Sequence, residues 1–157
     1  MKVHTAHNYK FIYLQQERNT KSQTMNLKEF LTSGDKMAQN EGVRLVEITP
    51  EYAVTEMTVE QRHLNAGGVC HGAAMFLLAD FALAAVSNTS GKLTFAISCN
   101  ITYHKGAHLG DVLTARAEMA SSHPKLPYSI VRITNQRGEL IATFTGTCYS
   151  KSQPLAN

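Results

Sequence analysis

Residues 71–88 read HGAAMFLLADFALAAVSN and form the longest apolar stretch of the 157-residue chain. Ala, Leu, Met and Phe favour a helix, and neither glycine nor proline interrupts the stretch after Gly72. From Ala73 to Val86, Asp80 is the only polar residue. A helix that is apolar on every side has to be surrounded by protein. The stretch therefore predicts one core helix with a carboxylate in its middle.

The segments on either side of this helix are rich in Val, Ile, Thr, Phe and Tyr and alternate with a period of two, which is typical of strands. Two strands precede the helix and four follow it, all joined by short links, so we expect an α+β fold with an antiparallel sheet of about six strands. The predicted strands are 43–48, 53–59, 93–104, 111–121, 128–135 and 139–149.

Length and amphipathic spacing suggest one domain over residues 35–150. Residues 1–34 are interpreted as an N-terminal extension with a short helix over 25–34, and Met25 is an alternative start. Residues 151–157 are assigned to a C-terminal tail. The net charge is +3 in residues 1–34 and zero in the rest. Without a clustered basic face, a nucleic-acid partner is not expected.

Cys70, Cys99 and Cys148 include no close pair, so neither a disulfide framework nor a CxxC metal site is predicted. This pattern fits a reducing cytoplasm. The apolar stretch from Gly72 to Val86 is shorter than the roughly 20 residues of a membrane span, and no membrane association is expected. The N-terminus lacks the pattern of a secretory signal.

Asp80 is the main candidate for chemistry, because an unpaired carboxylate inside an apolar helix is costly. One interpretation is structural, with Asp80 bonded to a hydroxyl or to backbone amides; the other is a general base or nucleophile. The first amides of the helix, near His71 and Gly72, favour a carbonyl oxygen that gains negative charge. Asn65 and Gly68 precede them in a flexible loop.

Geometry constrains how these groups can cooperate. Gly72 and Asp80 are eight residues apart, about 12 Å along one helix at about 1.5 Å per residue. A single helix cannot place both against one carbonyl group. Two helices packed antiparallel across a two-fold axis can, with Gly72 of one chain facing Asp80 of the other. The spacing therefore predicts an obligate homodimer with a shared site.

At these residues the chain resembles the hotdog-fold acyl-CoA thioesterases of the phenylacetic-acid-degradation (PaaI-like) type. The resemblance lies in HLNAGGVCHGAAMFLLADFALAAVSN at 63–88 and NITYHKGAHLGDVLTARAEM at 100–119, and extends over about 35–150. It implies a long helix wrapped by a curved sheet, homodimers and often homotetramers, and hydrolysis of an acyl-CoA substrate without a metal or cofactor. It also implies that Asp80 is base or nucleophile, that the Gly72 amide polarises the carbonyl, and that Asn65 orients reactants.

Two departures from the family pattern concern the site. Ala73 stands where the second glycine of the usual His-Gly-Gly is found, and it keeps an amide donor. Ala96 stands where some relatives carry serine to position water, and Thr94 or Ser98, which we expect on the same strand face, are substitutes. Lys105 and Arg116 are predicted to meet the phosphates of coenzyme A, as candidates alongside Lys125 and Arg137.

Other chemistries compete with this hypothesis. Cys70 and His71 form a candidate thiol–imidazole pair, and His104 with His108 are candidate metal ligands that lack a third partner. His71 with Asp80 resembles the pair of hotdog dehydratases or hydratases, but the His-Phe-Pro loop of those enzymes is absent. A non-catalytic acyl-CoA sensor is the third alternative. A thiol with a pKa near 8.5 leaves easily, so one carboxylate and an oxyanion donor suffice for hydrolysis.

Overall fold

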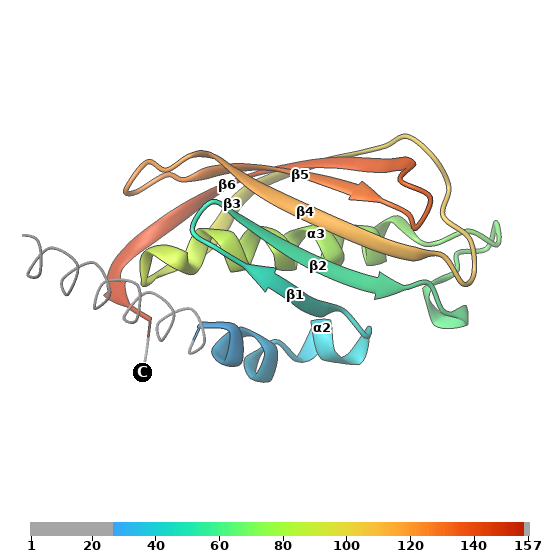
Figure 1. Cartoon of the computed structure of the whole chain (residues 1–157), viewed down its shortest axis with the longest axis horizontal. Coiled ribbons are helices and arrows are strands. Elements are labelled where there is room, and N and C mark those ends of the chain that lie inside the picture. Colours follow the sequence, from blue (N-terminus) through green and yellow to red (C-terminus); the bar gives the residue numbers. More distant parts are fainter. Residues whose placement is uncertain (1–26, 156–157) are drawn as a thin grey trace, which may run out of the picture.

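The computed structural model describes residues 27–155, which form one antiparallel sheet curled around one long helix (Figure 1). The helix is α3, Gly72–Ser87. The six strands are β1 (Arg44–Ile48), β2 (Tyr52–Thr58), β3 (Lys92–Tyr103), β4 (Val112–Ser121), β5 (Tyr128–Thr134) and β6 (Leu140–Pro154). This arrangement is the hotdog fold, and it confirms the predicted order of two strands, a helix and four strands.

The sheet runs in the order β1-β2-β4-β5-β6-β3, with every neighbouring pair antiparallel. Strand β3 follows the helix in sequence but lies at the sheet edge beside β6, the last strand. Its other edge has no partner strand in the described residues. A 12-residue strand with one open edge is a template for pairing with another chain.

Helix α3 is the centre of the core. Ten of its 16 residues are buried, among them Leu78, Leu83 and Val86, and its C-terminal cap is Asn88. The helical stretch Gly72–Ser90 is long and apolar enough to span a membrane, yet 67% of it is buried inside the fold. Burial by the sheet explains its composition, as the sequence predicted.

Helix α3 packs against β6 at Gly146. A β-carbon placed on Gly146 would lie 2.3 Å from Cδ2 of Leu83, which is itself fully buried. The helix can therefore approach the sheet at this point because residue 146 has no side chain.

Several boundaries differ from the sequence-based expectations. Strand β6 continues to Pro154, through residues assigned to a tail, because Ser150 and Pro154 pair with Thr94 and Lys92 of β3. Residues 27–34 are helical and bury Leu27. A second short helix, α2 (Lys36–Asn40), follows with Asp35 as its N-cap. Met25 and the rest of the extension lie outside the described residues.

Gly146→Ala is expected to lower the free energy of unfolding by about 1–3 kcal/mol, because the added methyl group overpacks a closed contact. Leu83→Val, which shortens the opposing side chain, should recover part of that loss in the double variant. Urea denaturation at one protein concentration measures both. Simple addition of the two single-variant losses would contradict this account of the contact.

Candidate active site

The loop at 63–71 is built by short-range hydrogen bonds. The Asn65 carbonyl accepts from Gly68 N at 2.9 Å, and its side-chain oxygen accepts from Gly67 N at 2.8 Å. Gly68 adopts a φ of +77°, a conformation that favours glycine. These bonds occupy Oδ1 of Asn65, while Nδ2 donates to no group within residues 27–155. The exposed Asn65 amide is therefore available as a donor to a ligand.

His71 is the N-cap of α3 rather than a free base. Its Nδ1 accepts from Ala73 N at 3.0 Å, and its backbone carbonyl accepts from Ala74 N at 3.0 Å. With Nδ1 accepting, the proton of the neutral ring lies on the exposed Nε2. The N–H of Gly72 has no acceptor in the described part of the chain. The sequence predicts several free amides at this helix end. Because His71 accepts from Ala73 N and Ala74 N, the Gly72 N–H is the free amide of these three.

Asp80 lies two turns further along, partly buried, on α3. No hydrogen bond or cation from residues 27–155 reaches its carboxylate. Every fully buried side-chain nitrogen or oxygen in those residues has a partner, so the Asp80 oxygens reach the surface. Burial, and secondarily the negative charge of Asp35, raise the pKa of Asp80. Residues 27–155 therefore do not supply the partner that the structural interpretation of Asp80 requires.

The surroundings of Asp80 include two thiols on the inner face of the sheet. Burial, and then the Asp80 charge, raise the pKa of Cys99 to about 11. The pKa of Cys148 is also raised, mainly by burial and to a smaller extent by the Asp80 charge. Burial alone raises the pKa of Cys70 to about 11, so this thiol is protonated at neutral pH and the Cys70–His71 nucleophile is not supported.

Thr94 and Ser98 do not share a strand face, contrary to the prediction. A bulge between Ala96 and Ser98 shifts the register of β3. Thr94 pairs with Ser150, and its buried hydroxyl bonds Ser150 Oγ at 3.0 Å, near the C-terminal end of α3. Ser98 pairs with Thr147, which lies between the inward-facing Gly146 and Cys148, so Ser98 points away from the helix. Neither residue is brought to Gly72.

Lys105 and Arg116 are both engaged by carboxylates. Lys105 Nζ lies 3.1 Å from Glu139 Oε1. Arg116 Nε lies 3.1 Å from Glu118 Oε1, on the outer face of β4 above the Tyr52 ring. The structure therefore does not bring either cation to Asn65, Gly72 or Asp80 as a free charge.

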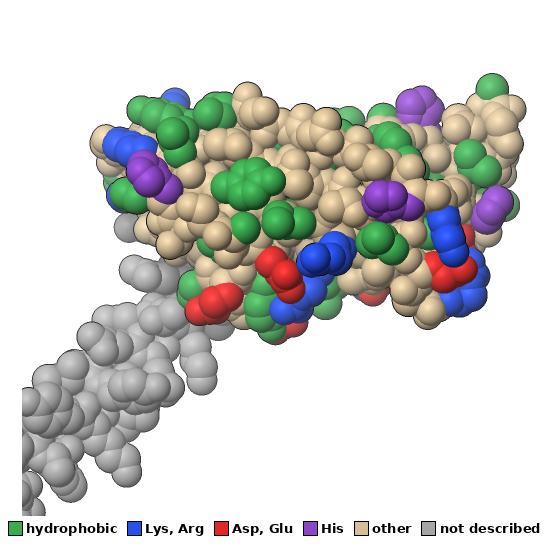
Figure 2. Space-filling model, turned by 90° about the horizontal axis from the view of Figure 1, so that it is seen from above, with side chains coloured by type: hydrophobic (Ala, Val, Ile, Leu, Met, Phe, Trp, Pro, Cys, Tyr) green, Lys and Arg blue, Asp and Glu red, His purple; other side chains and the backbone are tan. Residues whose placement is uncertain are grey.

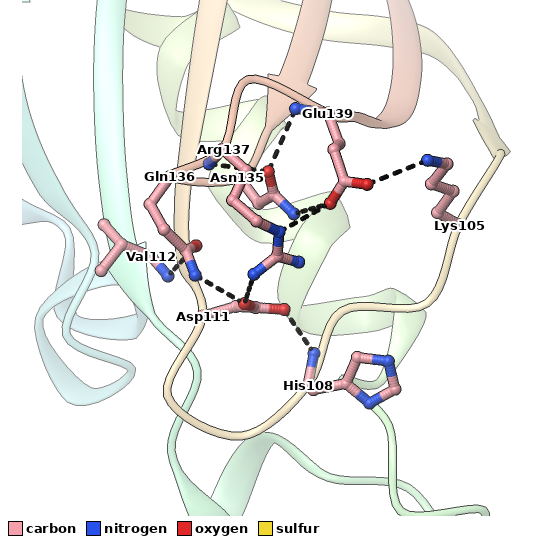
Figure 3. Close-up of polar contacts among 8 residues, drawn as sticks. All are labelled: Lys105, His108, Asp111, Val112, Asn135, Gln136, Arg137 and Glu139. Carbon is pink, nitrogen blue, oxygen red and sulfur yellow. Dashed lines mark hydrogen bonds and ion pairs between the residues drawn. The ribbon is translucent and has the colours of Figure 1, made fainter.

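A polar network that the sequence did not predict supports the loop at the start of α3 (Figure 3). Asp111 accepts from His108 N and from Gln136 Nε2, both at 2.8 Å, and Glu139 binds Asn135, Arg137 and Lys105. The segment held this way includes Ala107, whose carbonyl accepts from Cys70 N at 2.8 Å. The network thus fixes the 104–111 loop against the 63–71 loop.

The chain is similar in sequence and in structure to proteins of one known family. The profile of the "Thioesterase superfamily" matches residues 67–142. Acyl-coenzyme A thioesterase PaaI of Escherichia coli is 32% identical over 71% of this chain and 80% of its own length. Its solved structure covers 86% of this chain and 98% of its own, with a TM-score of 0.82 and 27% identity. The chain belongs to the PaaI-like thioesterases. As a member of this superfamily it is a thioester hydrolase.

Two further relatives are informative. Human acyl-coenzyme A thioesterase 13 is 31% identical over 77% of this PaaI-like chain and 91% of its own length. A hypothetical thioesterase of Streptococcus pneumoniae was solved with coenzyme A, with a TM-score of 0.68 and 26% identity over 72% of this chain and 88% of its own. Structures of that protein also exist with an aspartate and with a threonine replaced by alanine.

The network around Glu139 predicts acid sensitivity. Hydrogen bonds and ion pairs from Asn135, Lys105 and Arg137 lower the pKa of Glu139 to about 2. A carboxylate with a lowered folded-state pKa stabilises the protein above its unfolded pKa of about 4.3, and this contribution is lost as pH falls toward 2. Wild type should therefore melt above Glu139→Gln at pH 6, and the gap should close by about pH 2. Melting temperatures across this range check it; a gap independent of pH would contradict it.

Proposed function

We propose that this chain hydrolyses acyl-CoA thioesters, with Asp80 as general base or nucleophile and the Gly72 amide as oxyanion donor. The observation that carries the proposal is the Asp80 carboxylate, which is partly buried, accessible and unpaired within the described chain. Such a group makes no structural polar contact with another side chain of residues 27–155. A raised pKa also makes it a stronger base than an ordinary aspartate.

The reaction needs few protein groups. The Gly72 N–H and the Asn65 amide stabilise the charge that develops on the thioester oxygen. Asp80 either deprotonates water or attacks the carbonyl carbon directly, and the thiolate of coenzyme A leaves without needing an acid, since a thiol has a pKa near 8.5. The relatives named as acyl-coenzyme A thioesterases support the choice of substrate.

A shared site in a homodimer follows from distance. Gly72 and Asp80 are separated by about 12 Å along α3, beyond the reach of one carbonyl group. The open edge of β3 offers a place where a second chain continues the sheet, with the two helices side by side and antiparallel. In this arrangement Gly72 of one chain faces Asp80 of the other. Assembly of two such dimers into a tetramer remains a proposal from the family resemblance.

Of the four predicted candidates for the substrate phosphates, Lys125 alone has no carboxylate partner in the described residues, and Lys92 and Lys151 share this property. Lys92, Lys125 and Lys151 form no ion pair with any carboxylate of residues 27–155. Lys92 lines a cleft of about 360 Å³ at the C-terminal end of α3, with His123, Ser90 and Ser122, and no acidic residue lines it. In Figure 2, Lys or Arg (blue) and His (purple) side chains lie at the left end of the molecule, and the nearest Asp or Glu side chains (red) lie further down, along the lower edge.

When Gly72 of one chain faces Asp80 of the other, this end of one helix lies about 10 Å beyond Gly72 of the other, because Ser87 is seven residues past Asp80. We therefore propose that these three lysines bind the phosphates of coenzyme A. Surface arginines elsewhere are neutralised, as Arg44 is by Glu56 and Arg132 by Glu118.

The water-positioning hydroxyl of some relatives is absent at the equivalent place. The aspartate and threonine replaced in the two S. pneumoniae variants lie sixteen residues apart, as Asp80 and Ala96 do. Ala96 pairs with Cys148, on the inner face of the sheet. We infer that Ala96 stands at the place of that threonine and that no hydroxyl at this position orients the water here.

Asp80→Asn is expected to lower kcat by at least about 10²-fold across a panel of acyl-CoAs, since it removes the base or nucleophile without changing shape. Free-thiol release measures the rate, and light scattering should show the same oligomer as wild type. Full activity in the variant would refute the role of Asp80. Saturable binding of acyl-CoA by the wild type without thiol release would instead support the sensor alternative.

The pH profile tests the environment of Asp80. Because the pKa of Asp80 is raised, the rise of kcat/KM with pH should have its midpoint above 3.9, the ordinary value for aspartate. Asp35→Ser keeps an N-cap for α2 and removes one cause of the shift, so its midpoint should move down. A midpoint that moves up, or stays fixed, would contradict the contribution of Asp35.

Lys92→Ala combined with Lys125→Ala should raise KM for acyl-CoA on the order of 5-fold with kcat unchanged, as expected for exposed contacts of about 1 kcal/mol in total. Added salt should shrink the difference. Arg44→Ala is the matched control, because Glu56 already neutralises that arginine and neither residue belongs to the network around Glu139. An equal KM increase in the control would place the phosphates elsewhere.

A further inference from the structure

Tyr103, the last residue of β3, packs against Gly72, the first residue of α3. Its hydroxyl donates to the Gly72 carbonyl oxygen at 2.9 Å. A β-carbon on Gly72 would lie 2.7 Å from Tyr103 Oη and 2.8 Å from Cζ, closer than real β-carbons approach other atoms. The phenol ring therefore lies directly on the α-carbon of Gly72, and any side chain at position 72 would have to displace it.

The contact joins two parts of the chain that are 31 residues apart, and a rigid element supplies it. Tyr103 pairs with Ala142 of β6, and the next residue, His104, donates from its backbone to the Ile141 carbonyl at 2.8 Å. The backbone of Tyr103 is thus held by the sheet and not by the neighbouring loop. Tyr103 is 46% exposed, so it contacts Gly72 from the open side of the helix end.

The N–H of Gly72 shares a peptide plane with the His71 carbonyl, which accepts from Ala74 N, and the Tyr103 hydroxyl adds a second support on the carbonyl side of Gly72. The N–H groups of Ala73 and Ala74 are fixed by bonds to His71, whereas that of Gly72 binds no described residue. Glycine has the largest conformational freedom of any residue and no side chain to anchor it. An oxyanion donor acts only when it is held about 2.7–3.1 Å from the developing charge.

We propose that Tyr103 is a positioning residue that holds Gly72 so that its free N–H points at the substrate carbonyl. The inference rests on the proposed function, in which Gly72 is the oxyanion donor. The ring fixes the place of the α-carbon, and the hydroxyl fixes the carbonyl that follows it. Loss of the hydroxyl leaves the ring in place and relaxes only the orientation of Gly72.

Tyr103→Phe tests this directly. Removing an oxyanion donor costs about 10²–10³-fold in kcat, and misdirecting one costs part of that, so we expect kcat to fall about tenfold with KM unchanged. The pH midpoint of kcat/KM should stay where it is, because Asp80 is untouched. Tyr149→Phe is the matched control: Tyr149 is 43% exposed, and its hydroxyl forms no hydrogen bond within the described residues.

A spectroscopic measurement separates positioning from loss of structure. In an Asp80→Asn background, a bound acyl-CoA persists long enough for infrared difference spectra of its thioester carbonyl. The Gly72 N–H should lower that stretching frequency, and adding Tyr103→Phe should move it back toward the value in water. Adding Tyr149→Phe should leave it unchanged.

A double variant tests the packing of the Tyr103 ring on the α-carbon of Gly72. Gly72→Ala should lose both thermal stability and rate, since the methyl group displaces the ring. Adding Tyr103→Ala should restore the melting temperature and leave kcat low. Recovery of kcat would overturn the inference, as would a Tyr103→Phe enzyme with wild-type kcat and carbonyl frequency. A wild-type chain that turns over no acyl-CoA would overturn the proposed function and this inference together.

Discussion

The fold depends on the need to bury α3. The proposed chemistry depends on Asp80, the residue of α3 whose carboxylate is buried only in part. A helix apolar on every side is stable only when the sheet curls around it, and Gly146 permits the close approach to Leu83 that this requires. Asp80 is carried into this environment without a partner from the described chain. The burial that stabilises the fold is therefore also the main cause of the raised pKa of Asp80.

Strand β3 connects the fold to the proposed site in three ways. Its inner face brings Ala96 and Cys99 toward Asp80, its open edge offers the surface for a second chain, and its last residue, Tyr103, rests on Gly72. A strand fixed along its whole length by β6 can hold two catalytic elements at once. In a dimer with antiparallel helices, the Tyr103 end of one β3 lies near Asp80 of the partner.

The sequence was sufficient for features set by local pattern. The apolar run of α3, the alternation of the strands and the glycine-rich loop predicted the fold and the candidates Asn65, Gly72 and Asp80. It was insufficient where pairing between distant segments decides which way a side chain points and which charge it meets. A bulge in β3 turned Ser98 outward, and Glu139 and Glu118 neutralised Lys105 and Arg116 across strands and loops. Tyr103 lies in the stretch 100–119 that carries part of the family resemblance, but nothing in its spacing indicated contact with Gly72, 31 positions earlier.

The alanine at position 96 bears on how Asp80 works. Without a hydroxyl opposite the carboxylate, water is held by fewer groups, which lowers the advantage of general-base catalysis over direct attack. A thioester carbonyl held by the Gly72 and Asn65 donors is open to a carboxylate oxygen, and the anhydride that results is cleaved by water at either carbonyl. Hydrolysis of such an anhydride in H₂¹⁸O under single-turnover conditions transfers ¹⁸O into Asp80 whenever water attacks the enzyme carbonyl. Label in the Asp80 peptide would establish the nucleophilic path. Label found only in the acid product fits both an activated water and attack of water on the acyl carbonyl of the anhydride, so label in Asp80 is the outcome that separates the two paths.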